Sequence, residues 1–206
     1  SPGTCNDTFG TRAPTTGGSA LGSGTSSAAF SQNITGLTAA TTYYYCAIAS
    51  NSAGTVWGSV LTFITPSVPT ALTTAATNVT TSSATLNGSG NPNRTAATGW
   101  FRYSTTNPGV CDDKFGSRAP TSGGTALGSD IYDQPYSQSI SGLSSGTTYY
   151  YCAIVASTEG TAFGAVLSVT TSGAPTAVTN AASSITATAA SLNGAGNPNG
   201  ATTTAW

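Results

Sequence analysis

Short stretches of alternating apolar and polar residues recur along the chain, separated by turn-forming clusters. The stretches SATLNG at 83–88 and GWFRYS at 99–104 alternate in this way. TYYYCAIVAS at 148–157 and AFGAVLSVTT at 162–171 are rich in residues that favour strands. Clusters of Gly, Asn and Pro separate these stretches, and no segment shows a sustained 3.6-residue apolar period with helix caps. The pattern predicts an all-β chain of short strands.

The same pattern occurs twice, offset by 106 residues. CNDTFGTRAPTTGGSALGS at 5–23 matches CDDKFGSRAPTSGGTALGS at 111–129, and SLNGAGNPNG at 191–200 matches TLNGSGNPNR at 85–94. The alignment needs no gap, and more than half of the paired positions are identical. Repetition at a fixed period indicates tandem copies of one structural unit.

The segment GLSSGTTYYYCAIVAS at 142–157 resembles the E–F corner and F strand of fibronectin type III-like domains. SATLNGSGNPN and GWFRYSTT resemble strands B and C of bacterial variants of this fold, and GTAFGAVLSVTT resembles strand G. The resemblance implies tandem immunoglobulin-like (fibronectin III-like) sandwiches. It also implies which strand F residues point into the sandwich: Tyr149, Tyr151, Ala153 and Val155, and in the first copy Tyr43, Tyr45, Ala47 and Ala49.

Both copies carry two Cys with the same separation, Cys5 with Cys46 and Cys111 with Cys152. In the family pattern, Cys111 follows strand C and Cys152 lies on strand F, pointing away from the core. We therefore expect each pair to form a disulfide that pins the long C-to-E connection (about 105–135) across the outer face of one sheet. Usual members of the family lack this bridge, and four free buried thiols are the alternative.

The strand assignment predicts one complete sandwich between two complementary halves. Residues 68–172 contain strands A, B, C, E, F and G. Residues 1–67 supply only the late C connection with E, F and G, whereas residues 173–206 supply A, B and the start of C. Half a sandwich exposes an apolar face and unpaired strand edges, which promotes association.

We expect residues 173–206 to pair with residues 1–67 of a neighbouring copy, giving a head-to-tail string of sandwiches. Such a joined domain lacks the counterparts of 101–106, which include core residues of strand C. A covalent tandem repeat that continues through this strand is therefore the alternative way of joining. The predicted interface consists of apolar side chains on the two halves: Ile34, Leu61, Phe63, Val178, Ile185, Leu192 and Trp206.

Composition narrows the class of protein. Only 5% of the residues are charged, the net charge is −1 and five residues are basic, which argues against nucleic-acid binding. No apolar run reaches 18 residues, so we expect no membrane-spanning helix. Four Cys without His or a CxxC pair fit disulfides in an oxidising extracellular setting better than a zinc site. The chain lacks Met and begins without a leader pattern, so we expect a mature or excised segment.

Catalytic chemistry finds little support in the sequence. There is no His to act as general base. A Ser or Thr nucleophile has no activating partner, because the only Lys, Lys114, lies in an expected loop and the acidic residues are few. We expect no enzyme activity and no cofactor. The acids of the long connection offer oxygen ligands for Ca²⁺, but the first copy replaces most of them, which favours a solvated loop and no metal site. These acids are Asp112, Asp113, Asp130 and Asp133.

Two features could involve sugars. Exposed aromatic residues can bind carbohydrate, although core packing or contacts between domains is the favoured interpretation; the candidates are Trp57, Tyr132, Tyr136 and Tyr150. Glycans are a possible modification, on Ser or Thr or at the sequons of Asn6, Asn33, Asn78, Asn87 and Asn93. In a chain this rich in Ser, Thr and Asn, several sequons arise by chance.

These observations together predict a structural subunit of an extracellular or cell-surface filament or stalk, with other copies of itself as the partner. The low charge permits close packing of neighbours without repulsion. A spacer or carbohydrate-binding module pair from a secreted hydrolase or adhesin is the alternative. Further copies of the 106-residue unit would favour the filament, and a catalytic domain elsewhere in the gene would favour the alternative.

Overall fold

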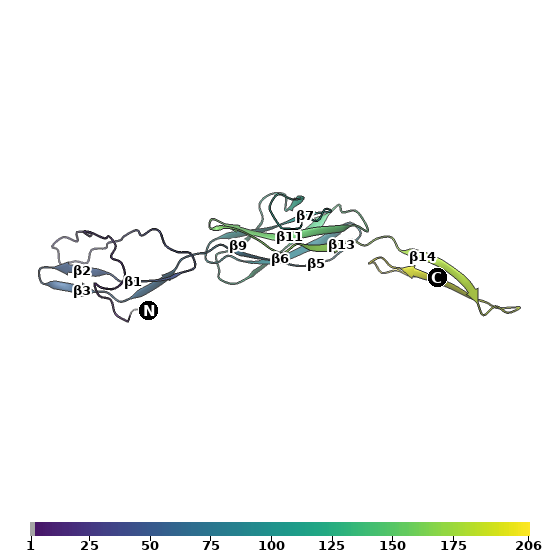
Figure 1. Cartoon of the computed structure of the whole chain (residues 1–206), viewed down its shortest axis with the longest axis horizontal. Helices are drawn as coiled ribbons and strands as arrows, with labels where there is room; N and C mark the ends of the chain where they lie inside the picture. The colour runs from purple at the N-terminus through teal and green to yellow at the C-terminus, as the bar shows by residue number, and fades with distance from the viewer. Residues whose placement is uncertain (1–2) are drawn as a thin grey trace. The chain divides into compact units, whose positions relative to one another are not determined.

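The computed structural model describes residues 3–206, which form fifteen β-strands (Figure 1). The all-β prediction is confirmed. Among these described residues, no helix is long and apolar enough to cross a membrane. The chain divides into two compact units, Ser1–Ser67 and Val68–Trp206.

The second unit contains a two-layered sandwich. Its first sheet consists of three antiparallel strands, β5 (Thr70–Thr77), β6 (Ser83–Asn91) and β10 (Gln134–Ser141), in the order β10-β6-β5. These strands take the places of A, B and E in the immunoglobulin-like pattern. Strand β6 alternates strictly between buried and half-buried positions, so its buried side faces the second sheet.

The second sheet has β11 and β7 at its centre. Its strands are β7 (Ala97–Ser104), β8 (Ser117–Ala119), β9 (Thr125–Gly128), β11 (Thr148–Ser157), β12 (Gly160–Phe163) and β13 (Leu167–Thr170). Strands β12 and β13 pair with β11, while β8 and β9 pair with the other side of β7. The C-to-E connection therefore contains two short strands that the sequence pattern did not predict.

The core lies between these sheets. Tyr151, Ala153 and Val155 are fully buried and Tyr149 nearly so, all in the cluster that also holds Leu86. The predicted inward set of strand F is thus confirmed for the complete sandwich.

A tyrosine corner fixes the start of β11. The backbone N–H of Ser144 donates to the Tyr149 hydroxyl at 3.0 Å, and the N–H of Thr38 donates to Tyr43 in the same way at 2.8 Å.

A second apolar cluster covers the outer face of β7 and β11. It consists of Trp100, Cys111, Cys152 and Ile154, with Phe115 packed against it. Both disulfides are present, and their Cα atoms lie 6.1 Å apart in Cys5–Cys46 and 6.0 Å apart in Cys111–Cys152. The second bridge holds the long connection over this face, as the sequence predicts.

In residues 3–67, the described part of the first unit, the strands form only hairpin-like pairs. Its strands are β1 (Thr42–Tyr45), β2 (Ile48–Asn51), β3 (Gly54–Trp57) and β4 (Leu61–Ile64). Strand β1 pairs with β4, and β2 pairs with β3. A shift of 106 residues superimposes these bounds on β11, β12 and β13. Tyr43 stacks on Phe63 with ring centroids 5.6 Å apart, whereas Tyr45 is exposed because no second sheet covers it.

Beyond the sandwich, β14 (Thr176–Ser183) and β15 (Ser191–Asn197) form an antiparallel hairpin with the register of β5 and β6. Every residue of both strands is exposed. Residues 204–206, at the expected start of strand C, form no strand. Their counterparts in β7 pair with β11, and within the described chain β14 and β15 pair only with each other.

Candidate interaction site: two incomplete sandwiches

The first unit lacks a defined subset of the strands seen in the complete sandwich. Strands β8, β9 and β10 have counterparts at 11–13, 19–22 and 28–35, and none of these segments is a strand. In the complete sandwich, β8 and β9 pair with β7, and β10 pairs with β6. The counterparts of β6 and β7 lie outside residues 1–67. The strands of the first unit pair with each other, whereas β8, β9 and β10 pair with strands that have no counterpart in residues 1–67.

Apolar side chains on the halves are exposed where their counterparts in the complete sandwich are buried. Leu192 is 89% exposed and its counterpart Leu86 is 0% exposed. Ile34 is 45% exposed, against 5% for Ile140. Trp206 is also exposed where Trp100 is buried. Leu61 and Ile185 are exposed and Phe63 is half-buried, while the counterparts of these three residues are half-buried.

Val178 differs from the other predicted interface residues. Its counterpart Leu72 is 54% exposed even in the complete sandwich.

Two further residues belong to the exposed apolar surface, although they are not among the interface residues predicted from the sequence. Leu21 and Phe30 are exposed, whereas their counterparts Leu127 and Tyr136 are buried. Leu21 and Phe30 become candidates only when burial is compared at equivalent positions of the two copies, because nothing in a single copy marks them.

Glycines of the hairpin leave room for an opposing sheet. A Cβ placed on Gly88 would lie 2.9 Å from the Cβ of Ala153 and 2.8 Å from the carbonyl oxygen of Leu72, so strand β11 fits only over a glycine. A Cβ on Gly194, its counterpart, meets only the carbonyl oxygen of Val178, at 3.2 Å. The hairpin therefore keeps a glycine at the position where β11 packs on β6, and no side chain lies within 4 Å of a Cβ placed there.

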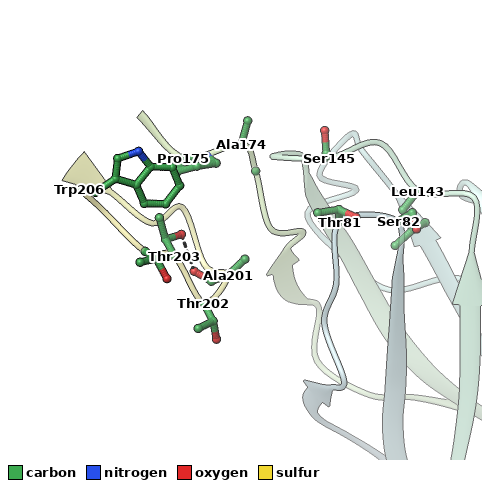
Figure 2. Close-up of a pocket in the computed structure, with 12 residues that line it drawn as sticks. Thr81, Ser82, Leu143, Ser145, Ala174, Pro175, Ala201, Thr202, Thr203 and Trp206 are labelled. Atoms are coloured by element: carbon green, nitrogen blue, oxygen red, sulfur yellow. Dashed lines mark hydrogen bonds between the residues drawn. The ribbon is translucent and has the colours of Figure 1, made fainter. Parts of the chain in front are cut away.

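The hairpin meets the sandwich at an open cleft with a volume of about 850 Å³ (Figure 2). The Ser172 hydroxyl donates to the carbonyl of Gly200 at 2.9 Å across this junction. Leu143 and the hydroxyls of Thr81 and Ser82 lie on the sandwich side, and Trp206 lies on the hairpin side. None of the residues that line the cleft is ionisable, so it offers apolar and hydroxyl surface and no acid or base.

The acids of the long connection are engaged locally. Asp112 accepts hydrogen bonds from the backbone N–H groups of Lys114 and Phe115, which lower the pKa of its carboxyl group. Asp113 accepts from the Trp100 indole at 2.9 Å and pairs with Arg102 at 3.0 Å. Across residues 3–206, no three His, Cys, Asp or Glu side chains form a group that could hold a metal ion.

The aromatic candidates for carbohydrate contact differ in their exposure. Tyr136 is buried in the core, where its hydroxyl donates to the carbonyl of Ile154 at 3.0 Å and burial raises its pKa. Tyr150 is half-buried, while Tyr132 and Trp57 are exposed in different units.

Two of the sequon asparagines donate side-chain hydrogen bonds to backbone carbonyls. The amide of Asn87 donates to the carbonyl of Ala75 at 2.8 Å, and the amide of Asn93 donates to the carbonyl of Val68 at 2.7 Å. A glycan at either side chain would replace one of these bonds. Asn33 and Asn78 are exposed.

No protein-family model matches the sequence, and no curated protein matches it. Similar solved structures include two forms of the sensor domain of the anti-sigma factor RsgI4 from Pseudobacteroides cellulosolvens. The longer form is 14% identical with a TM-score of 0.35, over 52% of this chain and 91% of that chain. The shorter is 14% identical with a TM-score of 0.36, over 52% and 96%. The FN1–FN3 domains of chicken CNTN1 are 16% identical with a TM-score of 0.35, over 66% of this chain and 44% of that chain.

Proposed function

We propose that this chain is a structural component of an extracellular filament or stalk built from head-to-tail, fibronectin III-like sandwiches. Residues 173–206 and residues 1–67 complete each other, either between separate copies or between successive repeats of one covalent chain. The role proposed is architectural and not catalytic.

The absent strands of the first unit carry this proposal. Segment 28–35 has the sequence of a β10 strand, and hairpin β14–β15 has the open edge of a β6 strand. In the complete sandwich Ile140 is paired with Ala84. The equivalent residues are Ile34, 106 positions before Ile140, and Ala190, 106 positions after Ala84, so the same pairing places Ile34 opposite Ala190. The same shift of 106 residues places Phe30 opposite Gly194. Each half thus supplies the strand edge that the other needs.

The joined sandwich is expected to be weaker than the complete one. It lacks a counterpart of Phe101, which is fully buried, and removing such a side chain from a core costs about 3–5 kcal/mol. Ordering segment 28–35 as a strand adds a cost of about 1–2 kcal/mol per residue. Burial of the exposed apolar residues must offset both costs, and a covalent continuation through the missing strand would remove the first.

A location outside the cell is supported by the two disulfides, because such bridges persist in oxidising compartments. The low charge supports close packing of repeated domains, because neighbours with little charge repel each other weakly.

The test uses a substitution that matters only in the joined state. Gly194→Val places a side chain where Ala47, the counterpart of Ala153, would pack, yet it meets no side chain in the separate chain. We expect Gly194→Val to abolish concentration-dependent association, measured by sedimentation velocity and electron microscopy. Ala195→Val is the matched control, because this neighbour points to the other face of the hairpin and should leave association intact.

Two results would contradict the proposal. One is a parent chain that stays monomeric at every concentration tested. The other is Gly194→Val associating as tightly as the Ala195→Val control. Native material run on a denaturing gel separates the two ways of joining, since separate copies give one band and a covalent tandem repeat gives a ladder or a very large band.

A further inference from the structure

The environment of Trp100 in the complete sandwich defines a specific binding pocket for an indole. Trp100 is 8% exposed on the outer face of β7, beside the Cys111–Cys152 bridge. Its indole N–H donates to Asp113 at 2.9 Å, and the guanidinium of Arg118 lies 4.6 Å from the ring centroid. The indole is thus held by a disulfide below it, a carboxylate at its edge and a cation over its face.

Residues 1–67 repeat the surroundings of this indole. The side chains 106 positions earlier are a disulfide, a carboxylate, a phenyl ring, a guanidinium and an isoleucine. We call this set the Trp socket, and it consists of Cys5, Cys46, Asp7, Phe9, Arg12 and Ile48. The strand that carries Trp100 has no counterpart in residues 1–67. The one Trp in that unit, Trp57, lies on β3 at the position of Phe163.

Two hydrogen bonds of the loop around Trp100 recur in the separate unit. The Arg12 guanidinium donates to the carbonyl of Gly17 at 3.3 Å, as the Arg118 guanidinium donates to the carbonyl of Gly123. The side chain of Asn6 accepts from the N–H of Thr8 at 3.0 Å, which holds the loop as Asp112 does in the second copy. These bonds hold the loop and its guanidinium although no indole from residues 1–67 is present.

Trp206 is the counterpart of Trp100, and its side chain is 107% exposed. It lies at the end of the segment that the proposed joining brings onto β2. In the complete sandwich, Ile154 is opposite Trp100, so the same register places Ile48 opposite Trp206. Within the separate chain, Trp206 instead lies at the rim of the open cleft beside the sandwich (Figure 2).

We propose that Trp206 of one copy binds in the Trp socket of a second copy. Its indole N–H donates to the Asp7 carboxylate, the Arg12 guanidinium lies over its ring, and its face packs on the Cys5–Cys46 bridge. The carboxylate and the cation are complementary to the edge and the face of an indole, so the socket selects Trp over other apolar residues. This inference rests on the proposed joining of residues 173–206 to residues 1–67.

The experiment measures self-association of the full chain by sedimentation equilibrium. We expect Trp206→Ala to raise the dissociation constant at least about 30-fold, as removal of a central aromatic residue from an interface does. Trp57→Phe is the matched control: Trp57 is opposite Ile48 on the neighbouring strand, and the complete sandwich has Phe163 at this position, so the change should leave the constant unchanged. Far-UV circular dichroism of Trp206→Ala should match the parent, since this side chain contacts no core.

A double-mutant cycle with Asp7→Ala and Trp206→Phe tests the hydrogen bond itself. Trp206→Phe removes the donor, so the two changes together should weaken association less than the product of their separate effects. Association that survives Trp206→Ala at parental strength, or a cycle that is fully additive, overturns the socket and leaves the proposed joining intact. A parent chain that never associates overturns the proposed joining, and the socket with it.

Discussion

The hydroxyl of Thr73 links the two sheets of the complete sandwich, and its removal gives a measurable loss. Thr73 is 5% exposed, and its Oγ1 accepts a hydrogen bond of 2.9 Å from the backbone N–H of Ala153. At this point β11 changes its edge partner, because β13 pairs up to Tyr151 and β12 pairs from Ile154 onward. The hydroxyl from the opposite sheet therefore satisfies a buried donor in the gap between two edge strands.

Thr73→Val keeps the shape of the side chain and removes only this acceptor. An unsatisfied buried donor costs about 1–3 kcal/mol. For a domain of roughly 100 residues, that loss lowers the melting temperature by roughly 5–20 °C. Thermal unfolding of the full chain followed by circular dichroism measures the change, and amide hydrogen exchange should show faster exchange at Ala153.

Thr73→Ser supplies the control, because it keeps the hydroxyl and loses one methyl group, at a cost of about 1 kcal/mol. Exchange at Ala153 should stay slow in this variant. A Thr73→Val variant whose stability stays within about 0.5 kcal/mol of the parent, a change typical of an unimportant surface site, would refute this role of the hydroxyl. Equally fast exchange at Ala153 in both variants would refute it as well.

Three further predictions follow from the same structure. Replacing Cys111 and Cys152 with Ala should lower the free energy of unfolding by about 4 kcal/mol, since the bridge closes a loop with a sequence separation of 41; an unchanged urea midpoint would contradict this. Burial raises the pKa of Tyr136, so the stability that its neutral side chain provides is complete below its ordinary pKa of about 10 and is lost as the pH rises above that value. Tyr136→Phe should therefore flatten the decline of the urea midpoint at alkaline pH, and an unaltered pH profile would contradict this prediction. Thr179→Val should leave the melting temperature unchanged because Thr179 is exposed, yet weaken association by removing the acceptor equivalent to Thr73; equal association of variant and parent would count against the joined register.

Local pattern was enough to predict the strands with strong periodicity. The alternation around Tyr149 and Tyr151 indicated which side of β11 faces the core, and the equal spacing of the Cys residues, read with the family resemblance, indicated both bridges. The strand alternation depends on residues that are close together in the sequence, and the Cys spacing is visible because both copies of the repeat carry it.

The short strands β8 and β9 could not be predicted from their own residues. Each has three or four residues in a Gly-rich connection, and each is a strand because β7 offers a partner edge. Their counterparts at 11–13 and 19–22 have nearly the same sequence and form no strand. The difference lies in the tertiary partner, so no reading of local sequence can distinguish the two copies.

The interface residues show the same limit. Leu21 and Phe30 resemble any apolar residue in a polar loop, and only the burial of Leu127 and Tyr136 indicates what they would contact. Val178, chosen for its apolar character, belongs to a position that stays exposed in the complete sandwich. Apolar character alone therefore only suggests interface residues, and the burial of their counterparts in the complete sandwich indicates which of them would be covered.

The Cys111–Cys152 bridge also sets how far the complete sandwich can lengthen under mechanical tension. A force applied at residues 68 and 172 can straighten only the chain outside the bridged segment, because the disulfide carries the tension past it. The bridge shields a sequence separation of 41, which corresponds to about 140 Å of extended chain at roughly 3.5 Å per residue. A pulled domain would thus extend only by the chain outside the bridge and then stop, and a reducing agent would release the remaining length.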